Sequence, residues 1–146
     1  MKVSIRSKWA LASTVYFAVN YSDNVIPLKT ASKALGISEK YLEQLVIPLK
    51  KSGLLESIRG VQGGYRLKKH PKEITVYEVL GSIEPIEFSD EVTSEDKGED
   101  KILFNVTDEF WSQLNSYVIK KLSEKTLEDF RDEYSNKSDE GFMYYI

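Results

Sequence analysis

Polar side chains suited to hydrogen bonding with nucleic acid are concentrated in the segment I-S-E-K-Y-L-E-Q-L. A glutamine such as Gln44 can pair with adenine through two hydrogen bonds, and Lys40 can reach guanine acceptors or a phosphate. The hydroxyls of Ser38 and Tyr41 suit phosphate oxygens. Glu43 can accept from the cytosine amino group or repel other sequences. The alternative is that Lys40 is a solvated surface lysine and that Tyr41 packs partly beneath its helix.

A second group of candidate contacts surrounds the glycine-rich stretch R-G-V-Q-G-G. It begins with Arg59 and Gly60, and a guanidinium on a thin hairpin could enter the electronegative minor groove of DNA. We therefore take Arg59 as the best single candidate. Other basic residues are expected to contact phosphates, unless they only keep the surface soluble: Lys2, Arg6, Lys8, Arg66, Lys68 and Lys69.

Apolar spacing predicts the helices that precede these contacts. Residues three and four positions apart share one helix face. This spacing holds for Ile5, Trp9, Ala12, Tyr16 and Val19. It predicts a first helix that ends near Tyr21. A second, short helix follows Pro27 and ends at Gly36, where a helix terminus requires positive φ.

The third helix is expected to carry the first group of contacts. Ser38 is a suitable N-cap for it. Its buried stripe is expected at Leu42, Leu45, Val46 and Leu49. Pro48 should kink this helix or end it early, and the pattern stops near Lys51. Helix, glycine turn and helix together form a helix-turn-helix pattern.

A β-hairpin and a fourth helix are predicted next. Residues 54–59 and 65–68 flank the glycines, which supply the unusual backbone angles of a hairpin turn. That hairpin would be the wing of a winged helix. Thr75 and Glu78 form a capping box, so a fourth helix should begin there. Its apolar positions are Val76, Val79, Leu80 and Ile83.

The second half of the chain is predicted to form an acidic loop and a long helix. Residues 87–100 hold seven acids and one lysine, which is typical of an exposed loop. The helix that follows begins near Asp100 or at Thr107. Its broad apolar face is expected to pack against a second copy of the chain. The alternative is that this face packs within one chain. The residues expected to dimerise are Phe110, Trp111, Leu114, Val118 and Leu122. Thr126 and Asp129 start a short helix, and residues 135–140 are interpreted as a polar linker.

Charge and composition limit the possible functions. Residues 1–70 hold twelve Lys and Arg against four Asp and Glu, whereas residues 71–146 hold eight against nineteen. A basic half on an acidic chain is typical of a DNA-facing surface, although charge blocks can also be mere solvated faces. The chain has no cysteine and one histidine, which excludes disulfides and thiolate-held metals. We expect no metal and no cofactor.

The predicted fold is mainly α with a small β-hairpin wing: a winged helix-turn-helix plus a long C-terminal dimerisation helix. We assign residues 1–86 to the DNA-binding domain, 87–100 to the acidic loop, 101–134 to the dimerisation helix with a short following helix, and 135–146 to a tail. The amino end has no apolar export segment, so a cytoplasmic protein is expected. No catalytic constellation or nucleotide motif is present, which argues against an enzyme.

Several segments together resemble the Rrf family of winged-helix transcriptional regulators. The matching pieces are M-K-V-S-I-R-S-K-W-A-L, I-S-E-K-Y-L-E-Q-L, S-I-R-G-V-Q-G-G-Y-R-L, T-V-Y-E-V-L and K-T-L-E-D-F. The resemblance spans nearly the whole chain. It implies a homodimer, held by long C-terminal helices, that binds double-stranded DNA through Ser38, Lys40, Tyr41, Gln44, Arg59 and Gly60.

The sequence departs from the cluster-binding members of that family. Those members carry three cysteines in the loop that corresponds to residues 88–104, and this chain has none. The lone His70 is interpreted as an exposed loop histidine that cannot hold a cluster. The chain is therefore more similar to the branch of cysteine-metabolism repressors represented by CymR, and that resemblance implies no metal.

The last residues carry a further resemblance to that branch. Met143, Tyr144, Tyr145 and Ile146 are similar to tails that resemble the peptide by which serine acetyltransferase enters O-acetylserine sulfhydrylase, also called cysteine synthase. A carboxylate beside an aliphatic side chain is a compact handle for backbone donors and an apolar pocket. The resemblance implies that cysteine synthase is a corepressor. The alternative is that the tail packs on its own dimer or frays.

Three functions remain open at this point. The first is a transcriptional regulator, and specifically a repressor, of cysteine and sulfur metabolism. The second is a regulator of the same family that responds to a different signal. The third is a winged helix used only for protein contact, against which the basic amino-terminal half and Arg59 argue.

Overall fold

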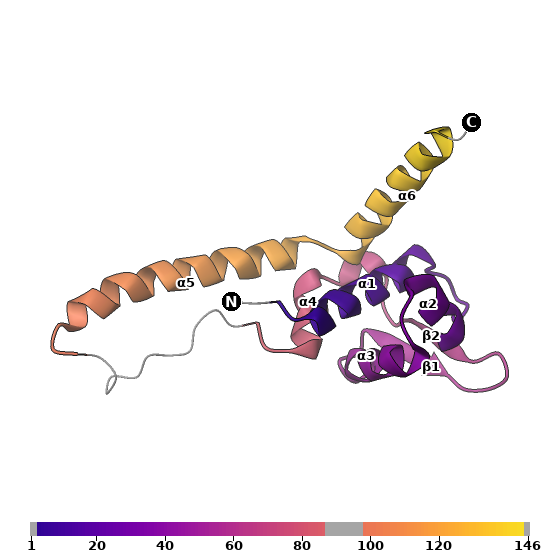
Figure 1. Ribbon diagram of the computed structural model, residues 1–146, viewed down its shortest axis with the longest axis horizontal. Helices are drawn as coiled ribbons and strands as arrows, with labels where there is room; N and C mark the ends of the chain where they lie inside the picture. Colours follow the sequence, from indigo (N-terminus) through magenta and orange to yellow (C-terminus); the bar gives the residue numbers. More distant parts are fainter. Residues whose placement is uncertain (1–2, 87–97, 145–146) are drawn as a thin grey trace.

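The computed structural model describes residues 3–86 and 98–144, and it is mainly helical with a two-stranded antiparallel sheet (Figure 1). The elements in chain order are α1 (Ile5–Val19), α2 (Leu28–Leu35), α3 (Glu39–Lys51), β1 (Leu55–Ile58), β2 (Gly64–Leu67), the 3-10 helix η1 (Pro71–Glu73), α4 (Val76–Ile83), α5 (Lys101–Glu124) and α6 (Leu127–Tyr144). The predicted fold class, a winged helix-turn-helix followed by a long helix, is confirmed.

Helix α1 buries a different face from the one that apolar spacing indicates. The buried residues are Ser7, Ala10, Ser13, Thr14, Phe17 and Ala18. Ile5, by contrast, is 67% exposed. Small side chains let α1 approach its neighbours closely, and the hydroxyls of Ser13 and Thr14 are satisfied by the carbonyls of Trp9 and Leu11, at 2.7 and 2.9 Å. A pattern that counts only apolar residues therefore selected the wrong face.

The helix-turn-helix forms as the sequence predicts. Gly36 ends α2 with φ of 71° and donates its amide to the Ser32 carbonyl at 2.9 Å. The Ser38 side chain caps α3 by accepting from the Tyr41 amide at 3.1 Å. The predicted stripe Leu42, Leu45, Val46 and Leu49 is buried. The turn and the cap together fix the direction in which α3 leaves α2.

Pro48 does not end α3, which continues to Lys51. The Ser52 amide donates to the Pro48 carbonyl at 3.0 Å, so the last turn is hydrogen-bonded beyond the proline. Proline removes one helix donor, and the buried stripe on either side of it holds the helix in place. The predicted end near Lys51 is confirmed, and Pro48 does not shorten the helix.

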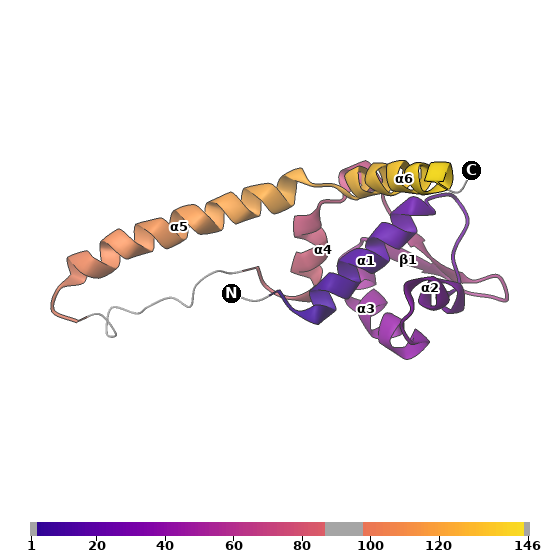
Figure 2. The same ribbon diagram turned by 45° about the horizontal axis from the view of Figure 1, so that its top comes forward.

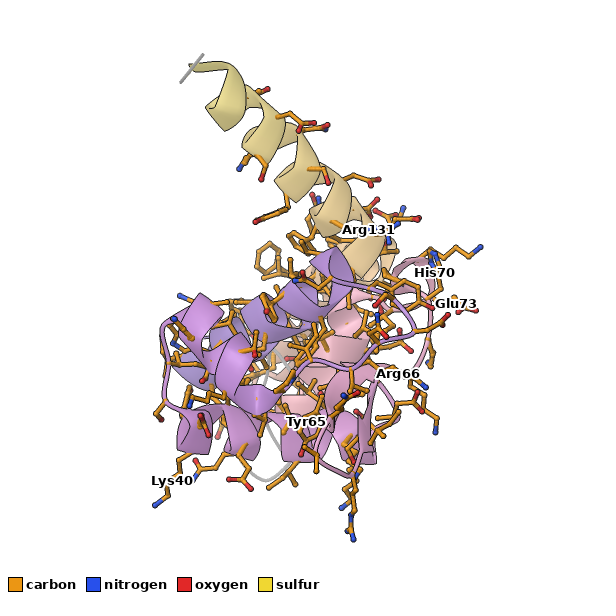
Figure 3. The ribbon with its side chains drawn as sticks, turned by 90° about the vertical axis from the view of Figure 1, so that its right-hand side faces the viewer. Lys40, Tyr65, Arg66, His70, Glu73 and Arg131 are labelled. Atoms are coloured by element: carbon orange, nitrogen blue, oxygen red, sulfur yellow. The ribbon has the colours of Figure 1, made fainter. Side chains whose placement is uncertain are left out.

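The wing is anchored by a connection that the sequence did not indicate. Its strands pair from Leu55 with Leu67 to Ile58 with Gly64. Ile26, between α1 and α2, pairs with Tyr65 through amide-to-carbonyl bonds of 2.8 and 2.9 Å. Tyr65 is labelled in Figure 3. The wing is thereby attached to the loop that precedes the helix-turn-helix.

Helix α5 begins at Lys101, which settles the choice left open between Asp100 and Thr107. Asp100 is its N-cap and accepts from the Ile102 amide at 3.1 Å. Figures 1 and 2 show that α5 projects from the folded body that contains α1–α4, with its first turns farthest from that body. Most of the acidic loop predicted at 87–100 lies outside the described residues.

Helix α6 corrects the prediction of a short helix followed by a polar linker. Residues 135–140 are helical and belong to α6. The chain has no proline or glycine from Leu127 to Glu140, so nothing in the backbone stops the helix. The far half of α6 projects from the body (Figure 1).

The first turn of α6 belongs to the core of the winged helix. Leu127 is completely buried and belongs to the same hydrophobic cluster as residues from α1–α4 and the wing. Its amide donates to the Ile74 carbonyl at 2.9 Å, and the Val76 amide donates to the Lys125 carbonyl at 2.9 Å. The boundary drawn after residue 86 is therefore incomplete, because the core of the folded body also needs residues that follow α5.

Candidate nucleic-acid interface

The outer face of α3, here called the reading face, lies opposite the buried stripe. Its exposed members are Glu39, Lys40, Glu43, Gln44, Ile47, Lys50 and Lys51. Figure 3 shows Lys40 at the edge of the domain, pointing away from its body. Because the buried stripe fixes the rotation of α3, these side chains are held on one surface that DNA can approach.

The other two predicted residues of α3 lie at its start and flank. Ser38 is exposed, and its Oγ accepts the Tyr41 amide, which leaves the hydroxyl hydrogen to donate outward. Tyr41 is half-buried. Tyr41 therefore packs partly against the domain, as the alternative interpretation expected, whereas Lys40 and Gln44 are exposed.

Arg59 and Gly60 lie where β1 ends and the wing turn begins, and both are exposed. Gly60 has φ of 127°, a conformation that favours glycine, and its carbonyl accepts from the Gly63 amide at 3.0 Å. Val61, next to it, is fully exposed. The turn therefore presents a cation and an aliphatic side chain at the end of the hairpin.

Arg66 is a structural anchor of the wing. Its Nε donates to Oε1 of Glu56 on the paired strand at 2.7 Å, and its guanidinium also donates to the Asp23 carbonyl. Glu56 and Arg66 are opposite each other in the strand register. These bonds use two of the five N–H donors of the guanidinium, so a phosphate contact through the remaining donors stays a prediction. The Glu56–Arg66 pair could have been predicted from the sequence only if the register of the two strands had been known.

Lys50 connects the reading face with the wing. Its Nζ donates to the Ser57 hydroxyl on β1 at 2.7 Å. Lys69, another expected phosphate contact, instead lies 3.4 Å from the carboxylate of Glu78. Sequence reasoning missed Lys50, since neither its position nor that of Ser57 carries a recognisable signal. This surface bond between Lys50 and Ser57 adds to the shared core of Leu49, Leu54 and Leu55, which positions α3 relative to β1.

The carboxylate of Glu84 connects the start of α1 to the end of α4. Oε1 of Glu84 accepts from the Ser4 hydroxyl at 2.6 Å and from the Ser7 hydroxyl. The hydrogen bonds from Ser4 and Ser7, together with the nearby charge of Arg6, lower the pKa of Glu84 from its ordinary value. These hydrogen bonds therefore stabilise the ionised form of Glu84.

His70 has a structural role. It is half-buried, its Nδ1 accepts from the Lys72 amide at 3.1 Å, and its ring lies edge-on to Tyr21 with centroids 5.3 Å apart. His70 and Glu73 lie close together in Figure 3, where they cap η1. His70 lies in the loop between β2 and η1, as interpreted, but the expectation that it is exposed was wrong, because the ring is used in packing and capping.

The predicted dimerisation residues form two groups on α5. Phe110 and Trp111 are 57% and 47% exposed, and their rings contact each other edge to face. Leu114, Val118 and Leu122 are half-buried and lie nearer the end of α5 that approaches α4. Ile102, Leu103 and Val106 extend the exposed apolar face toward the far end. This face has no cover within the described residues.

The predicted partner-binding residues are only partly described. Met143 and Tyr144 are the last residues of α6. Tyr145 and Ile146 lie outside the described residues. In the described segments, no helix has both the length and the apolar content needed to cross a membrane.

The helix-turn-helix formed by α2 and the capped α3, followed by a hairpin wing, defines the chain as a winged helix-turn-helix, a DNA-binding class of fold. The sequence profile of the Rrf2 family, described as "Iron-dependent Transcriptional regulator", matches residues 3–133. The chain belongs to the Rrf2 family of transcriptional regulators, as the sequence motifs indicate.

Individual relatives agree with this assignment. The chain is 31% identical to the HTH-type transcriptional regulator CymR of Bacillus subtilis (strain 168) over 150 residues, with all of both chains covered. It is 38% identical to the regulator IscR of Aliivibrio salmonicida over 84 residues, covering 58% of this chain and 50% of that protein. The IscR match is thus confined to part of both proteins.

Solved structures agree as well. The structure of CymR (YrzC), called the global cysteine regulator of B. subtilis, has a TM-score of 0.78 and 31% identity, and the match covers 91% of this chain and 98% of that one. The structure of T. potens IscR has a TM-score of 0.72 and 28% identity, with 92% and 88% covered.

The family description names iron, and the residues present do not fit a thiolate-held cluster. The chain has no cysteine to supply thiolate ligands. Across residues 3–86 and 98–144, no three His, Asp or Glu side chains are grouped as metal ligands.

Proposed function

We propose that this protein is a sequence-specific DNA-binding repressor of cysteine and sulfur metabolism genes that acts as a homodimer. The observation that carries the DNA-binding part is the row of polar and basic side chains that the buried stripe leaves exposed on α3, together with the exposed Arg59 at the wing turn. The base contacts come from Gln44 and Lys40 in the major groove, and Arg59 enters the adjacent minor groove.

The charge of the chain supports this orientation. The basic residues are concentrated before residue 70, and those on the reading face and wing turn are exposed. The acidic half, which includes α5 and α6, faces away from the duplex in this arrangement. Each phosphate that a lysine or arginine neutralises releases counterions, so binding should weaken steeply with salt.

Selection from a random duplex library tests sequence-specific binding. The full-length protein should enrich a partly palindromic duplex, whose affinity exceeds that of a scrambled duplex and falls linearly with salt on logarithmic axes. The scrambled duplex at the same salt concentrations is the control. A protein that enriches nothing and shows a flat salt dependence would refute DNA recognition.

The dimer is proposed to form through the apolar face of α5. A second copy is the fitting occupant because a palindromic duplex requires two reading faces related by a two-fold axis. Phe110 and Trp111 would form the centre of the contact, since large aromatic side chains contribute most to such interfaces. Leu114, Val118 and Leu122 would continue it toward the folded body.

The cysteine-related role is supported by the full-length similarity to CymR and by the segment M-Y-Y-I. We propose that this segment docks into O-acetylserine sulfhydrylase, which then acts as a corepressor. Because α6 extends to Tyr144, docking an extended peptide would require the last helical turn to unwind.

Co-purification with O-acetylserine sulfhydrylase tests the partner. The full-length protein should retain the enzyme, and deletion of Ile146 should abolish retention without changing the oligomeric state. A Lys137→Ala variant on the exposed part of α6 is the matched control and should retain the enzyme. If DNA is bound and the enzyme is not, the protein is a family member that responds to a different signal.

A further inference from the structure

One exposed residue of the reading face cannot hydrogen-bond to DNA. Ile47 is 62% exposed, and it is the one apolar member of the exposed set on α3. It lies three residues after Gln44 and four after Glu43, so the three side chains share the same helix surface. Isolated exposed aliphatic residues are common on proteins, but this one lies about one helical turn after Gln44, on the same exposed surface of α3.

The chemistry of Ile47 points to one feature of DNA. Of the four bases, only thymine presents a methyl group in the major groove, and apolar side chains recognise it by direct contact. Isoleucine is branched at Cβ and has one strongly preferred χ1 rotamer in a helix, so its methyl groups are held in place before binding. The buried neighbours Leu45, Val46 and Leu49 fix the backbone beneath it.

We propose that Ile47 is a specificity residue that contacts the 5-methyl group of a thymine in each half-site. This inference rests on the proposed DNA binding and adds an A·T preference at one defined position. The thymine should lie next to the base pair contacted by Gln44, because successive positions along one helix face meet successive base pairs in the groove.

Deoxyuridine provides a direct test, since it pairs like thymine and lacks only the methyl group. Each thymine of the selected duplex is replaced in turn, and affinities are measured for the wild-type protein and for Ile47→Ser. At one thymine per half-site, deoxyuridine should weaken wild-type binding about 3- to 5-fold, as expected for the loss of one buried methyl group. The same replacement should leave Ile47→Ser unchanged.

Val61→Ala is the matched control. Val61 is an exposed β-branched residue on the wing turn, which faces the minor groove in the proposed arrangement, where thymine presents no methyl. This variant should keep the full deoxyuridine effect. Helix content measured by circular dichroism verifies that both variants fold.

The outcomes separate the two levels of the proposal. If no duplex is selected, DNA recognition itself fails. If the duplex binds and deoxyuridine weakens the wild type and Ile47→Ser equally, or weakens neither, the role of Ile47 is overturned. A loss of affinity in Ile47→Ser that is the same for every thymine replacement also overturns it, because such a loss does not depend on the methyl group.

Discussion

Ser7, in the first turn of α1, donates its hydroxyl hydrogen to the carboxylate of Glu84 at the end of α4. Ser7 is almost fully buried, and the same carboxylate oxygen accepts from the Ser4 hydroxyl. Two elements separated by the whole helix-turn-helix and wing are therefore joined at the point where the chain leaves the folded body toward α5.

This contact should make stability depend on pH. The pKa of Glu84 in the folded protein lies below its ordinary value of 4.5, so its contribution is complete above that value and is lost as pH falls through the lowered folded value. In thermal unfolding, Glu84→Gln should be less stable than the wild type at pH 7, and the difference should vanish in acid. Glu140→Gln, on the projecting part of α6, is the control and should show no such difference. A gap that stays constant with pH would contradict the prediction.

Gly64→Ala should destabilise the attachment of the wing. A Cβ at this position would overlap the carbonyl oxygen of Ile26, whose strand-like pairing with Tyr65 anchors the hairpin. We expect a loss of about 1–3 kcal/mol in denaturant unfolding, as for other overpacked sites. Gly141→Ala in α6, where a Cβ meets open space, should leave stability unchanged or raise it. Equal behaviour of the two variants would show that the close approach is unimportant.

Arg59→Ala should weaken DNA binding without affecting the fold. Loss of an arginine contact in a groove typically costs about 1–3 kcal/mol, and the salt dependence should become shallower by about one ion if the guanidinium also neutralises a phosphate. Fluorescence anisotropy on the selected duplex measures both. Lys137→Ala removes the same charge from α6 and should bind like the wild type. An unchanged affinity of Arg59→Ala for the duplex would show that the wing does not contribute to DNA binding through this residue.

Phe110→Glu should dissociate the dimer. Placing a charge among exposed aromatic and aliphatic side chains should raise the dimer dissociation constant by about 30-fold or more, since central aromatic residues dominate such contacts. Ser112→Glu introduces the same charge roughly 200° around the helix and should remain dimeric. Sedimentation equilibrium distinguishes these results. A wild-type protein that sediments as a monomer would reject the α5 interface.

The sequence predicted local features well where the backbone requires a particular residue type, as at a helix cap or at a position with positive φ. The cap at Ser38, the left-handed turn at Gly36 and the capping box of Thr75 with Glu78 all form as expected. Each depends on residues within one helical turn, which makes it readable from the sequence. The exposure of Lys40 and Gln44 also follows from the buried stripe of α3, and their contact with DNA stays a prediction.

Predictions that depended on distant partners were less successful. The buried face of α1 is set by small residues such as Ala10 and Ser13, which apolar spacing cannot distinguish from surface residues. The roles of Arg66 and Lys50 require knowledge of the wing register and of its distance from α3. The length of α6 was missed because its polar composition resembles that of a linker, whereas its first turn is held by Leu127 in the core.

The position of Leu127 also determines the order in which the molecule can be completed during synthesis. The core that supports α3 and the wing includes a residue that follows the whole of α5 in the chain. On the ribosome, the amino-terminal helices therefore emerge well before the last side chain of their core. This core is completed only after the helix proposed to recruit the second copy has been made. A nascent chain halted before α6 would therefore lack one buried side chain of the core that α3 and the wing share.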